Sequence, residues 1–71
     1  MVRTNTLINK IRDLGYTFKS QRSRVMIWRK GTDFVSIPRR DLVEDGFVRS
    51  TLRQAGCSEA EIEAFIASAK S

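Results

Sequence analysis

The sequence predicts an α+β domain in which helices pack on one face of a three-stranded antiparallel sheet. Apolar residues recur at helical spacing near both ends of the chain, they alternate with polar residues in the middle, and glycines or polar residues separate these stretches. The expected order is helix, three strands, helix and a last helix, with strands and helices grouped rather than alternating. A chain of 71 residues suits one domain, so we expect a single domain over residues 1–71.

The first helix is expected over residues 6–14. Its apolar face consists of Leu7, Ile8, Ile11 and Leu14. Thr4 or Asn5 can cap its first turn, and Gly15 can adopt the left-handed conformation that often follows a helix.

The middle of the chain has the pattern of a sheet. Residues 16–19 alternate aromatic and polar side chains, residues 20–23 are polar and predict a loop, and residues 24–30 are rich in strand-forming types. Within that second strand, Val25 and Ile27 face one side and Met26 and Trp28 the other. A turn at residues 30–33 leads to a third strand at residues 34–37, which Pro38 ends, so these two strands form a hairpin.

Two further helices are expected after a polar connection. The helix at residues 47–55 has Val48, Leu52 and Ala55 on one face, with Glu44 and Asp45 at its start and Gly56 after its end. Ser58 and Glu61 have the spacing of a capping box, which opens the last helix. The apolar stripe of that helix consists of Ile62, Phe65, Ile66 and Ala69.

The positive charge is concentrated in one segment. The net charge is +5, yet residues 19–40 alone hold seven basic residues and one acidic residue. Clustered positive charge raises the local concentration of polyanions and speeds their encounter. We therefore expect contact with nucleic acid rather than a merely soluble surface.

Several classes of protein do not fit this sequence. Cys57 is the single cysteine, and we expect a small, half-buried residue without a redox role. No apolar run reaches the roughly 20 residues of a membrane helix or resembles a signal peptide. These features favour a cytoplasmic protein with no membrane contact.

Catalytic chemistry also finds little support. The chain has no histidine, so no side chain has an ordinary pKa near neutrality, and Tyr16, Cys57 or a lysine would need a large shift to act as a base. The carboxylates of Asp41, Glu44 and Asp45 are better explained by the start of a helix than by Mg²⁺. We expect no metal, no cofactor and no small-molecule ligand.

RNA fits the basic segment better than DNA. The last two helices resemble a helix-turn-helix, but the second begins with Glu59, Glu61 and Glu63, which phosphates would repel. A-form RNA shows phosphates and 2′-hydroxyls across a shallow groove, which proteins meet by shape and charge. Trp28 could stack on a base, although a strand tryptophan more often belongs to the core. The expected RNA-binding residues are Lys19, Arg22, Ser23, Arg24, Arg39, Arg40, Arg49 and Arg53.

Two motifs carry a family resemblance. Ile37-Pro38-Arg39 is followed after a spacer by residues 46–58, which read GFVRSTLRQAGCS. This resembles the HicA (YcfA-like) toxin family, with its Val-Pro step and its Gly-Thr-Leu-Arg-Ser-Ile-Leu-Arg-Gln-Ala-Gly-Leu-Ser run. The first helix ending in Leu14-Gly15-Tyr16 and the Trp28-Arg29-Lys30 segment also agree, so the resemblance covers most of the chain.

The resemblance implies a double-stranded-RNA-binding-like fold, an mRNA-cleaving activity and a partner antitoxin of the HicB type. The catalytic histidine of the family, in a Gly-Ser-His signature, falls on Val25 or, one residue earlier, on Arg24. A second frequent family histidine falls on Arg40. Arginine neutralises phosphate but cannot act as a base at neutral pH. Ser23, Arg24, Arg39 and Arg40 would then line the former catalytic site.

Three functions follow as hypotheses. The first is an RNA-binding HicA-like domain without nuclease activity. The second is an active mRNA interferase that uses a base other than histidine. The third is a protein-interaction module whose basic face binds an acidic partner, because arginine is common at interface hot spots.

Overall fold

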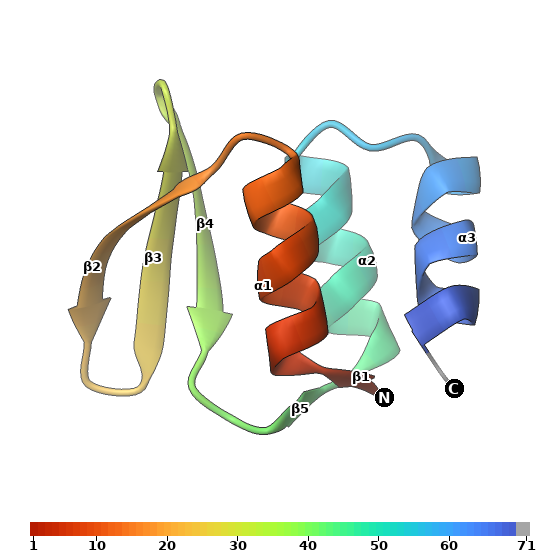
Figure 1. Cartoon of the computed structure of the whole chain (residues 1–71), viewed down its shortest axis with the longest axis horizontal. Coiled ribbons are helices and arrows are strands. Elements are labelled where there is room, and N and C mark those ends of the chain that lie inside the picture. The colour runs from red at the N-terminus through yellow and green to blue at the C-terminus, as the bar shows by residue number, and fades with distance from the viewer. Residues whose placement is uncertain (70–71) are drawn as a thin grey trace.

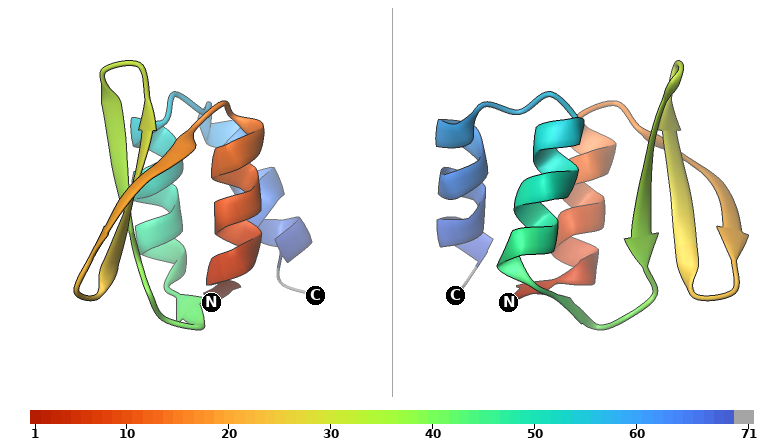
Figure 2. Two further views of the ribbon diagram at one scale, coloured as in Figure 1. Left: turned by 60° about the vertical axis from the view of Figure 1, so that its left-hand side comes forward. Right: turned by 180° about the vertical axis from the view of Figure 1, so that it is seen from behind.

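A three-stranded sheet is covered by helices on one face and left open on the other (Figures 1 and 2). The computed structural model describes residues 1–69. In chain order the elements are β1 (Val2–Arg3), α1 (Thr4–Asp13), β2 (Thr17–Arg22), β3 (Val25–Lys30), β4 (Asp33–Pro38), β5 (Leu42–Val43), α2 (Asp45–Gln54) and α3 (Glu59–Ala69). The predicted α+β class with a three-stranded antiparallel sheet is confirmed.

The sheet has the order β2-β3-β4, and both pairings are antiparallel. A two-residue turn, Ser23 and Arg24, joins β2 to β3, while Gly31, with a φ of 60°, allows the turn from β3 to β4. The pairing of β2 with β3 is interrupted between Phe18 and Ser20, so Lys19 lies in a bulge.

The core lies between the covered face of the sheet and the helices. The predicted apolar faces meet there: Leu7 and Ile11 of α1, and Val48 and Leu52 of α2, are completely buried. α3 packs beside α2 and contributes Ile62 and Ile66 to the same cluster. The sheet adds Met26, Trp28, Val35 and Ile37 to this cluster. The expected division between Val25 with Ile27 and Met26 with Trp28 is therefore confirmed.

The helix ends follow the expected chemistry in most places. Gly15 and Gly56 have φ values of 99° and 93°, as the ends of α1 and α2 require. The capping box is confirmed: Glu61 N–H donates to Ser58 Oγ over 3.2 Å, and Ser58 N–H donates to Glu61 Oε1 over 3.0 Å.

Several expectations about local structure are wrong. α2 begins at Asp45 rather than at residue 47. α1 begins at Thr4 rather than at residue 6, and neither Thr4 nor Asn5 is its cap, because Arg3 holds that position without a side-chain hydrogen bond. Residues 20–22 extend β2 instead of forming a loop. The third strand runs from Asp33 through Pro38, slightly longer than expected.

A second, two-stranded sheet was not expected. β1 pairs antiparallel with β5, and Val2 and Val43 at its centre are completely buried. The N–H of Thr4 donates to the carbonyl of Asp41 over 2.9 Å, which joins the start of α1 to the same ribbon. Within residues 1–69, no helix is long and apolar enough to cross a bilayer.

Candidate nucleic-acid interface

Segments that are distant in sequence meet at one end of the molecule. The β2–β3 turn, the connection from β4 to β5 and the start of α1 all lie at the lower end in Figure 1. The N–H of Arg39 donates to the carbonyl of Arg24 over 2.8 Å, so the turn and the β4–β5 connection are held together by their backbones. The sheet register therefore fixes the positions of Arg22, Arg24, Arg39 and Arg40.

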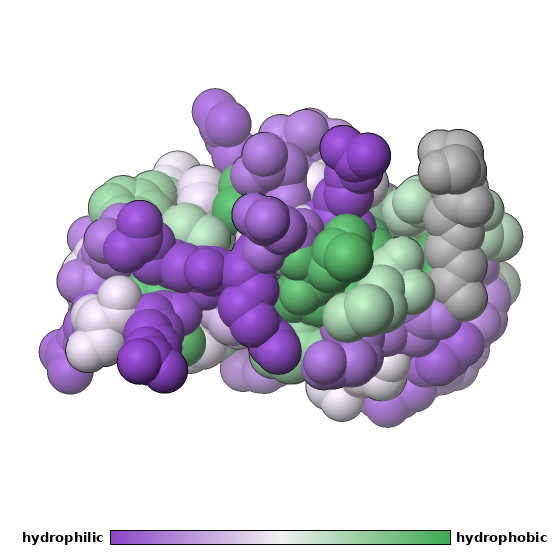
Figure 3. All heavy atoms as spheres, turned by 90° about the horizontal axis from the view of Figure 1, so that it is seen from below, coloured by the Kyte–Doolittle hydropathy of each residue, from purple (hydrophilic) through white to green (hydrophobic). Residues whose placement is uncertain are grey.

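Arg3 belongs to the same end, although it lies outside the basic segment of the sequence. Pairing of β1 with β5 places Arg3 opposite Leu42, and Arg3 and Arg40 line one pocket. Figure 3 views this end directly and shows hydrophilic side chains, in purple, across its left and central parts. We call this surface the basic end, and its residues are Arg3, Arg22, Arg24, Arg39 and Arg40.

The charge of the basic end is largely uncompensated. All five arginines are exposed. Among the described residues, Arg40 is the one member paired with a carboxylate, and its distance to Glu44, 3.7 Å between Nη1 and Oε1, is long. Exposed pairs of this kind contribute little free energy. The guanidinium groups are therefore available to an external anion.

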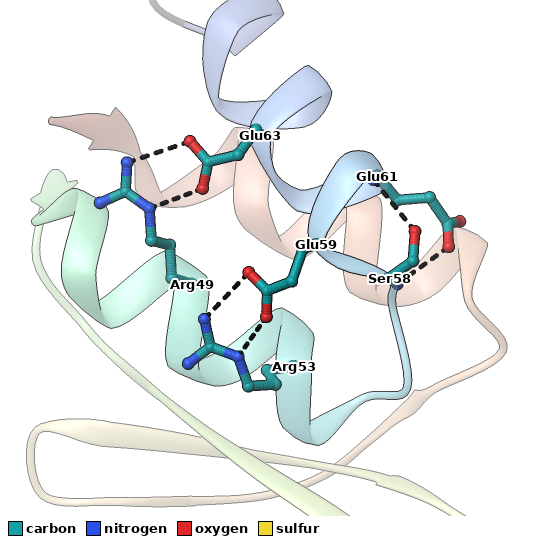
Figure 4. Close-up of polar contacts among 6 residues, drawn as sticks. All are labelled: Arg49, Arg53, Ser58, Glu59, Glu61 and Glu63. Carbon is teal, nitrogen blue, oxygen red and sulfur yellow. Dashed lines mark hydrogen bonds and ion pairs between the residues drawn. The ribbon is translucent and has the colours of Figure 1, made fainter.

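Arg49 and Arg53 have a different environment. Each forms two hydrogen bonds with a glutamate of α3: Arg49 with Glu63, at 2.7 and 3.1 Å, and Arg53 with Glu59, also at 2.7 and 3.1 Å (Figure 4). These bonds raise the pKa of both guanidinium groups, and the bond from Arg53 lowers the pKa of Glu59. We call this contact the α2–α3 seam. The predicted phosphate contacts of Arg49 and Arg53 would compete with these pairs.

Lys19 is separated from the basic end. Its Nζ lies 4.7 Å from the centroid of the Phe34 ring, and Phe34 is near the start of β4. The basic end lies at the opposite end of β4, where Arg39 follows the strand. This contact is a cation–π interaction on the surface, since Phe34 is 41% exposed. Lys19 thus adds positive charge to the sheet but is not part of the arginine cluster.

The positions onto which the resemblance in sequence would place a histidine lie at the β2–β3 turn. Ser23 and Arg24 form the turn, with Ser23 at a φ of 40°, and Val25 is half-buried at the start of β3. Arg24 carries a guanidinium group and Val25 an aliphatic side chain, and neither is a usual general base. The turn thus presents an exposed, positively charged side chain beside a half-buried aliphatic one.

Other candidate chemical groups belong to the fold. Trp28 is 7% exposed and forms an edge-to-face pair with Phe18, so the possibility that it stacks on a base is not supported. Burial, followed by the nearby Asp33 and Cys57, raises the pKa of Tyr16 away from neutrality. Cys57 is a half-buried free thiol, as expected, and the described part of the chain holds no cluster of three potential metal ligands.

The RNA-binding residues predicted from the sequence do not include Arg3, which the structure places at the basic end. They do include Lys19, Arg49 and Arg53, which lie apart from the basic end. Arg22, Ser23, Arg24, Arg39 and Arg40 are brought together as expected. Comparison of the chain with family models, curated proteins and solved structures finds no match. Evidence for its function therefore comes from the geometry of the basic end and from the sequence motifs at Ile37-Pro38-Arg39 and residues 46–58.

Proposed function

We propose that this protein binds duplex or structured RNA through the basic end, on a HicA-like scaffold of the double-stranded-RNA-binding type, and that it does not cleave the RNA. The observation that carries the proposal is the convergence of five exposed arginines, of which one has a carboxylate partner among residues 1–69. Arginine suits this role because its planar fork binds phosphate with two hydrogen bonds.

The shape of the interface supports RNA as the polyanion. The arginines come from the ends of β1 and β2, the β2–β3 turn and the β4–β5 connection, so they do not line one helix that could enter a DNA major groove. A-form RNA presents its shallow groove and the flanking phosphates to such a surface. We therefore expect recognition by shape and charge, with little dependence on base sequence.

The absence of cleavage follows from the side chains at the interface. Metal-free RNA cleavage uses a base that removes the proton of the 2′-hydroxyl and an acid that protonates the leaving group. The basic end consists of arginines, with Ser23 in the adjoining turn, and an arginine keeps its proton at neutral pH. Arginines in place of the family histidines thus favour retention of phosphate binding and loss of turnover.

The test is binding of an RNA duplex and an RNA hairpin, measured by fluorescence anisotropy across a salt series. Five phosphate contacts predict that the logarithm of affinity falls with the logarithm of salt with a slope of about −4. A DNA duplex of the same sequence and an acidic polypeptide serve as competitors. Absence of RNA binding at low salt would refute the proposal, and tight binding of the polypeptide alone would favour a protein partner.

The same RNAs, recovered after incubation, test for cleavage. Intact RNA is expected at every concentration of protein. Specific fragments, together with growth arrest on expression that a neighbouring antitoxin-like gene relieves, would instead support an active interferase.

A further inference from the structure

The start of α1 differs from the starts of the other two helices. Its first turn contains no acidic residue, and its cap residue, Arg3, makes no side-chain hydrogen bond, as is also true of Glu44 at the start of α2. By contrast, Asp45 lies in the first turn of α2, and Glu59 and Glu61 lie in that of α3. The positive end of the α1 dipole is therefore not offset by an acidic side chain in its own first turn.

Backbone donors at this helix start also remain to be satisfied. The N–H of Thr4 donates to the carbonyl of Asp41. The N–H groups of Asn5 and Thr6 have no helical carbonyl four residues before them, so the helix itself provides no acceptor for them. Such groups need water, a side chain or a ligand as acceptor. Oriented N–H groups at a helix start are a common site for phosphate.

A pocket opens at this point. It has a volume of about 460 Å³ and is lined by Arg3, Thr4, Asn5, Arg40, Asp41 and Leu42. Two arginines thus line a pocket at the positive end of a helix. The volume falls in the range of sites for small organic ligands, which exceeds what one small ion requires.

The hydroxyl of Thr4 lies buried behind the wall of this pocket. Thr4 is 4% exposed, it forms part of the pocket wall, and its Oγ1 is buried without a hydrogen-bond partner in the described part of the chain. A buried hydroxyl without a hydrogen-bond partner lowers the stability of the fold, so the presence of one beside the pocket needs an explanation. Threonine in a helix populates two χ1 rotamers, and a ligand can select the one that turns the hydroxyl into the pocket.

These groups define the chemistry of the ligand. Two arginines, free backbone donors and a hydroxyl suit an anion with several oxygens and more than one charge, as a phosphate monoester has. The carboxylate of Asp41 would repel a bare phosphate but can accept hydrogen bonds from the hydroxyls of a sugar. Leu42, which is 44% exposed, adds an apolar surface beside it.

We propose that this pocket binds the phosphate monoester of a nucleotide, with the phosphate on Arg3, Arg40 and the start of α1 and the sugar towards Asp41. The nucleotide is either free or the 5′-phosphorylated end of an RNA strand. In the second form the inference rests on the proposed RNA-binding function, whereas the free-nucleotide form does not depend on it.

The direct test is a titration of the ¹⁵N-labelled full chain, followed by NMR, with inorganic phosphate, a nucleoside 5′-monophosphate and the matching nucleoside. The amides of Asn5 and Thr6 are expected to shift in a saturable way with the nucleotide, several-fold more tightly than with phosphate. No shift is expected with the nucleoside. Absence of saturable shifts at these amides with both phosphate-containing probes would overturn the proposal.

Two variants and a control locate the site. Thr4→Val keeps the shape of the side chain and removes a hydroxyl without a partner, so the fold is retained while nucleotide affinity falls about tenfold. Arg3→Gln is expected to give a similar loss. Arg12→Gln, at the other end of α1, is the matched control and leaves affinity unchanged. Unchanged affinity in both site variants would overturn the proposal.

The RNA arm compares otherwise identical duplexes that carry a 5′-phosphate or a 5′-hydroxyl. A several-fold preference for the phosphorylated duplex, lost in Thr4→Val, supports binding of a strand end. Equal binding of the two duplexes contradicts that form and leaves RNA binding intact. Failure of both duplexes to bind, with the nucleotide shifts preserved, refutes the RNA function while the nucleotide site stands.

Discussion

Two sets of arginines in this small protein have opposite environments. At the basic end, five arginines from four segments converge, and one has a distant carboxylate partner among residues 1–69. At the α2–α3 seam, Arg49 and Arg53 each hold a glutamate through two short hydrogen bonds. The same side chain thus lies exposed and largely without a carboxylate partner in one region, and joins two helices in the other. The surroundings of an arginine, rather than its presence, indicate its role.

The largest expected effect tests what holds α3 in place. Ile62 is completely buried in the core, so Ile62→Ala should lower the free energy of unfolding by about 2–5 kcal/mol. This would be a large part of the stability of so small a domain. Urea denaturation measures the loss, and Ala64→Ser on the exposed side of α3 is the control. A loss no larger than that of the control would mean that the ion pairs, not the core, secure the helix.

The next effect concerns the basic end. Arg24→Gln with Arg39→Gln should weaken RNA binding roughly tenfold for each arginine, since hydrogen bonds to charged groups contribute about 1.5–3 kcal/mol. The slope of the salt dependence should become shallower by about 2. The matched control is Arg49→Gln with Arg53→Gln, which removes the same charge from the α2–α3 seam. Equal losses in the two double variants would contradict the distinction between the regions.

A gain of function provides a sharper test of the same distinction. Glu59→Gln with Glu63→Gln removes the carboxylates that hold Arg53 and Arg49, which frees two guanidinium groups and takes away two negative charges. RNA affinity should rise a few-fold at low salt and return towards that of the natural sequence as salt increases. Anisotropy titrations at two salt concentrations measure this. A fall in affinity without unfolding would show that the intact seam itself assists binding.

The smallest effect is the response of stability to acid. The hydrogen bond that the Ser58 N–H donates to Glu61, together with the Ser58 hydroxyl, lowers the pKa of Glu61 from its ordinary value, and the bond from Arg53 lowers the pKa of Glu59. The stability that these carboxylates contribute is complete above the unfolded-state pKa and is lost as pH falls through the lower folded-state values. Thermal unfolding in an acid series should show this decline. Glu61→Gln should flatten it, and an unchanged slope would argue against the capping box as a source.

Much of the fold follows from the periodicity of the sequence. Leu7 and Ile11, or Val48 and Leu52, are each four residues apart and become completely buried, because helical spacing directs them to one side. The β1–β5 ribbon could not be found in this way, since two residues per strand are too few to show alternation. The full length of β2 was missed because the Ser23-Arg24 turn lacks the Asn-Gly or Asp-Gly signature of tight hairpins.

The candidate site was predicted only where neighbours in sequence are also neighbours in space. Arg22 and Arg24 flank one turn, and Arg39 and Arg40 follow the strand that pairs with β3, so clustering along the chain was informative. Arg3 lies near them because β1 pairs with β5, and no local pattern in the sequence predicts this pairing.

The α2–α3 seam did carry a signal in the sequence. Glu59 and Glu63 repeat the four-residue spacing of Arg49 and Arg53, in the order that two antiparallel helices bring together. The prediction that Arg49 and Arg53 contact phosphate rested on their spacing along α2 alone and did not include α3. Matching charge intervals on adjacent helices are thus evidence for an internal contact.

The burial of Trp28 has a consequence for spectroscopy. It is the single tryptophan of the chain, its indole N–H is enclosed without a partner among the described residues, and its ring forms an edge-to-face pair with Phe18. Its fluorescence should therefore be blue-shifted in the native protein and should shift to longer wavelengths when unfolding admits water. Because the ring faces the core and not the basic end, RNA should leave the emission maximum unchanged. One sample can thus report folding by tryptophan emission and binding by a dye on the RNA.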